Sequence, residues 1–167
     1  MVLADLVFLY SVGFTMDGQI YKQLTEHARK IIENSYELAS LARHERVYAA
    51  HLLRAMLTDS RGNIAMAALT ALASELDTRA GSRIAQGDAM GERDGQINID
   101  ALVQHATLQA GAIGHSYAGP EHLLLALLED PFWPDVAAYF RVPNLTRVRL
   151  RAEIFAILGR DDPACSA

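Results

Sequence analysis

The sequence predicts an all-α domain that contains two copies of one helical unit. Apolar residues make up 51% of the 167 residues but aromatic residues only 7%, and Ala and Leu dominate the apolar share. Ala and Leu favour helices, whereas strands are enriched in β-branched and aromatic residues. A chain of this length is expected to form one domain with a full-sized core.

An internal repeat is the second observation behind this prediction. Residues 71 positions apart match without a gap, mostly in apolar residues and histidines. The matched pairs are His44 with His115, His51 with His122, Leu52 with Leu123, Leu53 with Leu124, Ala55 with Ala126, Leu57 with Leu128, Asp59 with Asp130, Ala39 with Ala110 and Ile32 with Val103. We therefore expect repeat one at about 20–74 and repeat two at about 96–159.

Residues at i, i+3, i+4 and i+7 predict one buried face on the first helix of each repeat. In repeat one this face is formed by Leu24, Ala28, Ile31, Ile32, Ser35, Leu38, Ala39 and Ala42. In repeat two it is formed by Leu102, Val103, Ala106, Ala110 and Ile113. The second helices follow a short turn, at His51-Leu52-Leu53 and His122-Leu123-Leu124, so each repeat is expected to begin as a helical hairpin.

Capping residues indicate the remaining helices, for a total of about eight. Asn63 suits the N-cap of a third helix, and Pro134 suits the first turn of its counterpart in repeat two. The last helix is expected to start near Asn144 and to stop at Gly159. Its expected apolar positions are Leu145, Val148, Ala152, Phe155 and Leu158. The two four-helix repeats are expected to pack about a pseudo-twofold axis, because each has an apolar face to bury.

Three segments fall outside the repeats. Residues 1–19 form an apolar extension that lacks the basic start and cleavage site of a signal peptide and is too short to span a membrane. We expect it either to dock on the domain or to precede a true start at Met16. Residues 75–95 predict a surface linker, and residues 160–167 a polar tail.

Charge and cysteine content limit the functions to consider. The chain has 15 Lys and Arg against 20 Asp and Glu, a net charge of -5, which disfavours binding to nucleic acid or to an anionic membrane. The single cysteine, Cys165, allows no intramolecular disulfide and no cysteine-based metal site. We expect a cytoplasmic protein without a cofactor.

Two segments carry a resemblance to a known family. Residues 24–30 (LTEHARK) leading to His51-Leu52-Leu53, and residues 114–128 (GHSYAGPEHLLLALL), resemble the double repeat of Clp N-terminal domains. Residues 145–149 (LTRVR) resemble the start of that family's final helix. In the family the double repeat precedes AAA+ ATPase modules and receives substrates or adaptors for unfolding and proteolysis.

The resemblance implies a non-catalytic protein-binding module, here expected to stand alone. A nucleotide-binding loop ends in Gly-Lys-Ser/Thr. Neither of the only lysines, Lys22 and Lys30, follows a glycine. We therefore expect an accessory or adaptor-like factor, or a ligand decoy, of the Clp system. The expected partners are a Clp unfoldase, its adaptors or its substrates.

The resemblance also implies a ligand site in each repeat. In Clp domains of the Gram-positive type, a Thr near the first helix and the Glu before His-Leu-Leu bind a phosphorylated arginine, with the carboxylate on the guanidinium. Matched by position, repeat one has Thr25 but Ala50 in place of the Glu, and repeat two has Glu121 but Gln96 in place of the Thr. Each site therefore keeps only one of the two residues that bind the ligand in the family. Glu121 can equally serve only to stabilise the helix dipole.

Two features of the sequence are similar to parts of enzyme active sites. The pairs His44/His51 and His115/His122 suggest a metal site of a small metal-dependent enzyme, but a metal site needs further ligands, so a role in satisfying buried backbone groups is favoured. Residues 114–118 (GHSYA) are similar to the G-x-S-x-G turn of serine hydrolases, but a helix precedes them where that turn needs a strand. We therefore expect no enzyme and no bound metal.

Phe132 and Trp133 are the remaining candidates for partner binding. Exposed, they would form a hot spot for a partner protein. Aromatic residues between two prolines in a loop also often cap a core. The sequence thus leaves five candidate binding residues, which are Thr25, Gln96, Glu121, Phe132 and Trp133.

Overall fold

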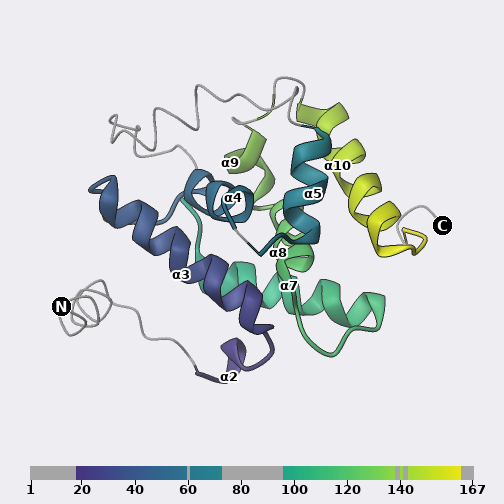
Figure 1. The fold of residues 1–167 in the computed structure, drawn as a ribbon, viewed down its shortest axis with the longest axis horizontal. Helices are drawn as coiled ribbons and strands as arrows, with labels where there is room; N and C mark the ends of the chain where they lie inside the picture. Colours follow the sequence, from purple (N-terminus) through teal and green to yellow (C-terminus); the bar gives the residue numbers. More distant parts are fainter. Residues whose placement is uncertain (1–17, 60, 73–95, 138–139, 141–142, 163–167) are drawn as a thin grey trace.

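A computed structural model shows an all-helical fold, as predicted (Figure 1). It describes residues 18–59, 61–72, 96–137, 140 and 143–162. The eight helices within these ranges are α2 (Gly18–Tyr21), α3 (Glu26–Leu41), α4 (Ala49–Leu57), α5 (Ile64–Ala71), α7 (Ile99–Ile113), α8 (Pro120–Leu127), α9 (Trp133–Ala137) and α10 (Pro143–Leu158). The predicted linker, residues 1–17 of the N-terminal extension and residues 163–167 of the polar tail lie outside the described residues.

Capping side chains fix where the helices start. The Thr25 hydroxyl accepts a hydrogen bond from the backbone N–H of Ala28 at 3.1 Å and begins α3. Asn63 is the N-cap of α5, as predicted, and accepts from the N–H of Met66 at 2.7 Å. Such a cap stabilises a helix because the first turn leaves its N–H groups without partners. At the other end of the chain, α10 stops at Gly159, whose φ of 63° suits glycine.

The two repeats share one core. The helix α3 packs on α4 and α7 packs on α8, so each repeat begins as the predicted hairpin. The repeats also exchange contacts through their third helices, because α5 packs on α8 as well as on α4, and α9 contacts α4. The last helix, α10, lies beside α5 and α8 (Figure 1). This exchange fits the pseudo-twofold arrangement that the duplication predicts.

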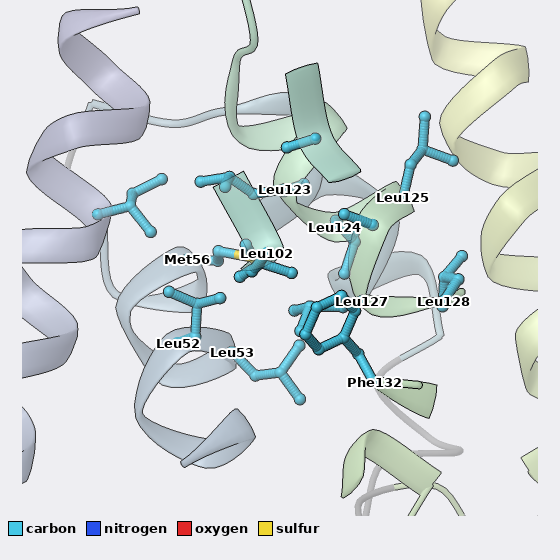
Figure 2. Packing of buried hydrophobic residues seen from close by; sticks show 14 of the residues in the cluster. Leu52, Leu53, Met56, Leu102, Leu123, Leu124, Leu125, Leu127, Leu128 and Phe132 are labelled. Carbon is cyan, nitrogen blue, oxygen red and sulfur yellow. The ribbon is translucent and has the colours of Figure 1, made fainter. Parts of the chain in front are cut away.

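The second helices, α4 and α8, lie at the centre of the core. Figure 2 shows Leu52 and Met56 of α4 gathered with Leu102 of α7 and Leu124 of α8. All four side chains are fully buried. Burying one such side chain contributes about 1.5–3 kcal/mol, so this cluster supplies much of the stability. None of the helices in the described ranges has both the length and the apolar character needed to cross a membrane.

The prediction for the face of α10 is partly wrong. Leu145 and Val148, which were expected to face the core, are 53% and 67% exposed. Phe155 is buried as predicted, and the other buried residues are Thr146, Leu150 and Ile154, spaced four apart. Apolar residues occur on both sides of this helix, so the sequence period defines no unique face. Contacts with α5 and α8 decide which side is buried.

Phe132 and Trp133 belong to the core. Only 4% of Phe132 and 6% of Trp133 is exposed. Phe132 packs edge-on against His105 with ring centroids 5.2 Å apart, and Trp133 stacks on Phe140 at 5.6 Å. The expectation that these two residues form a surface for a partner is therefore wrong, because their aromatic area is already covered.

Candidate functional site

Two short backbone pairings join the repeats. In the first, the N–H of Ala118 donates to the carbonyl of Gln23 at 2.8 Å, and the N–H of Thr25 donates to the carbonyl of Ala118 at 3.0 Å. This pairing, called the Thr25 joint, consists of residues 23–25 and Ala118. It ties the start of α3 in repeat one to the segment just before α8 in repeat two.

The second pairing is related to the first by the duplication. The N–H of Ile97 donates to the carbonyl of Val47 at 3.0 Å. The Arg46 guanidinium donates to the side-chain oxygen of Gln96 at 2.7 Å. This pairing, called the Gln96 joint, consists of residues 46–48 and 96–97. It ties the start of repeat two to the segment just before α4 in repeat one.

The joints favour a different grouping of the candidate ligand residues. Thr25 pairs with Ala118, and Glu121 follows Ala118 by three residues in the first turn of α8. Ala50 lies instead in the first turn of α4, beside the segment that pairs with Gln96. These connections favour grouping Thr25 with Glu121 and Gln96 with Ala50, across the repeats rather than within each one.

Glu121 folds back over the start of α8. Its carboxylate lies so close to Gly119 that a Cβ atom at that position would overlap it, and repeat one has Tyr48 and Ala50 at the equivalent positions. Its Oε1 atom lies 3.0 Å from Nδ1 of His122. Burial acts to raise the pKa of Glu121, but hydrogen bonds from His122 and from its own backbone N–H outweigh burial and hold the pKa below its ordinary value. The group is therefore an ionised carboxylate at neutral pH.

The other side of the Thr25 joint favours an anion. The N-terminus of a helix carries a partial positive charge, and α3 is 16 residues long. The Arg29 guanidinium donates to the carbonyl of Leu24 at 3.3 Å, so a full positive charge lies at the same end of the helix. The joint thus combines a carboxylate on one side with a hydroxyl, a helix N-terminus and a cation on the other.

The histidine pairs cap the second helices, which confirms the structural role favoured by the sequence. Nδ1 of His51 accepts from the N–H of Tyr48 at 3.0 Å, and its Nε2 lies 3.1 Å from Nδ1 of His44. The same arrangement recurs in repeat two, where Nε2 of His122 lies 2.9 Å from Nδ1 of His115. In each repeat, Nδ1 of the capping ring lies within hydrogen-bond distance of the N–H that precedes its helix.

Burial lowers the pKa of one histidine in each pair. Burial, with a further effect of His44, lowers the pKa of His51 to about 4. Burial also lowers the pKa of His115, with His122 and Arg160 adding to the shift. Uncharged imidazole rings are the form that can cap a backbone N–H or bind a metal.

One buried carboxylate was missed by sequence reasoning. Asp59 accepts from the side chain of Asn63 at 3.0 Å and from the N–H of Arg61 at 3.2 Å, and it also contacts His27. Burial acts to raise the pKa of Asp59, but these hydrogen bonds lower it overall. The residue ties α3, the end of α4 and the start of α5 together. Its match in repeat two, Asp130, is exposed, so the duplication gave no sign of this role.

Sequence comparisons relate the chain to a known family. Residues 23–132 match the family described as the Clp repeat (R) N-terminal domain. The chain is 28% identical over 155 residues to the negative regulator of genetic competence ClpC/MecB of Bacillus subtilis, and 28% identical over 151 residues to the chaperone protein ClpB of Oceanobacillus iheyensis. These alignments cover 89% and 86% of this chain but only 18% of each relative.

A solved structure is also similar. It is the N-terminal domain of the caseinolytic protease associated chaperone ClpD from Arabidopsis thaliana, with a TM-score of 0.44 and 17% sequence identity. The match covers 84% of this chain and 90% of that domain.

Proposed function

Because the chain belongs to the Clp repeat (R) N-terminal domain family, we propose that it is a non-catalytic protein-binding module of the Clp system. In this proposal it engages a Clp unfoldase, its adaptors or its substrates, as an accessory or adaptor-like factor or as a ligand decoy. Support comes from the match over residues 23–132.

The ligand that fits the Thr25 joint best is a phosphorylated arginine side chain. The observation that carries this part of the proposal is the pair of hydrogen bonds between Ala118 and residues 23–25. They bring a residue of each repeat to one joint, so that Thr25 and Glu121 act together. An arginine phosphorylated on its guanidinium presents N–H donors and an anion side by side, and the joint offers the complement of each.

Each part of the joint has a distinct role in this proposal. The ionised Glu121 accepts hydrogen bonds from the guanidinium, a charge-assisted pair that is shorter and stronger than a neutral one. The start of α3 binds the phosphate, with Thr25 as a hydroxyl donor and Arg29 as a cation. The hydroxyl of Thr25 has this capacity because it can donate one hydrogen bond while it accepts from Ala28.

The Gln96 joint serves as the natural control. It has Gln96 in place of Thr25 and Ala50 in place of Glu121, and its Arg46 already pairs with Gln96. Without a carboxylate it lacks a partner for a guanidinium. We therefore expect one ligand per chain.

Recovery of partners from the protein's own cells tests the proposed function. The tagged full chain, its Glu121→Gln variant and a Gln96→Ala control are purified side by side, and the proteins retained are identified. We expect a Clp ATPase, its adaptors or their substrates to be enriched with the wild type and the control, and reduced with Glu121→Gln. A wild type that retains no Clp component above an unrelated tagged protein would contradict the proposal.

A further inference from the structure

The two histidine pairs differ in one neighbour. In repeat two, His115, Glu121 and His122 each bring one atom able to bind a metal ion, and these atoms lie within 4.8 Å of one another. In repeat one the histidines are present, but Ala50 replaces the carboxylate. Within the described ranges, this is the group of three that could hold a metal ion.

The surroundings of His122 are contradictory for a neutral ring. Its Nδ1 lies 2.9 Å from the N–H of Gly119, which needs an acceptor, and 3.0 Å from Oε1 of Glu121, which needs a donor. A neutral imidazole can satisfy only one of the two at this nitrogen. His51 has no such conflict, because Tyr48 provides an N–H there and Ala50 provides no carboxylate.

A metal ion suits the state in which Nδ1 carries the proton. That proton is then donated to Glu121, and Nε2 of His122 turns a lone pair toward Nδ1 of His115, 2.9 Å away. In the metal-free ring this lone pair can accept the Nδ1 proton of His115, and a metal ion can take the place of that proton between the two nitrogens. A carboxylate that holds the far nitrogen of a metal-binding histidine is the usual arrangement around such ions.

We propose that repeat two binds one divalent transition-metal ion, with Zn²⁺ as the expected ion. His115 Nδ1 and His122 Nε2 are the ligands, Glu121 orients His122 and supplies negative charge, and water or a partner's donor atoms complete the coordination. Two histidine nitrogens on tetrahedral zinc lie about 3.3 Å apart, from Zn–N distances of about 2.0–2.1 Å. The two rings therefore need to separate by only a few tenths of an ångström.

The local charges are compatible with this site. The Arg160 guanidinium, which donates to the carbonyl of Ile113 close by, opposes a cation. The carboxylate of Glu121 offsets that charge. Repeat one has the uncharged Ala50 at the position equivalent to Glu121.

This site goes beyond the proposed function, although Glu121 belongs to both. The test uses metal alone and no peptide, so its failure leaves peptide binding untouched, and the reverse also holds. The full chain carries Cys165→Ser, which removes the lone thiol as a competing ligand. The metal-free protein is titrated with Zn²⁺ by calorimetry and with Co²⁺ by visible absorption.

We expect one ion per chain in the wild type. Glu121→Gln should weaken binding by about 10–100-fold, because it keeps the shape of the side chain but loses its charge. His115→Ala should abolish binding, and the matched variant His44→Ala in repeat one should leave it unchanged. A wild type that binds no Zn²⁺ would overturn the proposal, as would a His44→Ala variant that loses binding together with His115→Ala.

Two further measurements guard against variants that fail to fold. In the wild type, NMR signals of the His115 and His122 rings should shift on addition of Zn²⁺, whereas those of His44 and His51 should not. The double change Tyr48→Gly and Ala50→Glu places the glycine and the glutamate of repeat two at the equivalent positions of repeat one and should add a second ion. Shifts confined to other histidines would refute the assignment.

Discussion

At the scale of single residues, buried titratable side chains each stabilise the fold in one charge state. His51 is 2% exposed and must remain neutral to accept the N–H of Tyr48. Asp59 must remain ionised to accept hydrogen bonds from Asn63 and the backbone of Arg61. Protonation of either side chain therefore weakens the folded state.

Asp59 leads to a prediction about pH. Its pKa is lower in the folded chain than in the unfolded chain, so its contribution to stability is complete well above pH 4 and is lost as the pH falls through the folded pKa. We expect Asp59→Asn to reduce the free energy of unfolding near pH 7 by about 1–3 kcal/mol. The deficit relative to the wild type should shrink below about pH 4.

Urea denaturation over this pH range measures the effect. The control is Asp130→Asn, the matched position in repeat two, whose side chain is 75% exposed. A change at such a surface position should stay within about 0.5 kcal/mol. Equal losses in the two variants, or a deficit at Asp59 that does not depend on pH, would contradict a stabilising role for the ionised carboxylate.

At the scale of elements, amphipathic spacing predicted the helices that have one apolar face. On α3 the expected positions Ala28, Ile31 and Ile32 are buried, and on α7 the expected Leu102 and Val103 are buried too. On α10 the same reasoning failed in part, because apolar residues occur on both sides of the helix. Only contact with α5 and α8 decides that Ile154 is buried and Val148 is exposed.

A pair of substitutions on α10 tests this orientation. Ile154 is fully buried, so Ile154→Ala should destabilise the protein by about 2–5 kcal/mol through lost contacts and a cavity. Val148→Ala should change the free energy of unfolding by no more than about 0.5 kcal/mol, because Val148 is 67% exposed. Thermal or urea denaturation of the two variants gives the comparison. A larger loss for Val148→Ala would mean that α10 packs with its other face.

At the scale of the whole molecule, exchange between the repeats governs both the core and the candidate site. The helix α5 contacts α8 of the opposite repeat as well as α4 of its own, and α9 contacts α4. The two joints connect the start of each repeat to the loop of the other. The candidate residues Thr25 and Glu121 could be named from the sequence. Their grouping could not be predicted, because a sequence repeat reveals equivalent positions but not which residues of the two copies lie close together in space.

Calorimetric titration with free phosphoarginine tests the composite Thr25 joint most directly. The wild type is compared with Thr25→Ala, Glu121→Gln and the control Gln96→Ala. We expect one binding event per chain, lost or strongly weakened in the first two variants and retained in Gln96→Ala, because the Gln96 joint has Ala50 in place of a carboxylate. No heat in the wild type, or binding lost in Gln96→Ala but kept in Thr25→Ala, would contradict a ligand site at the Thr25 joint.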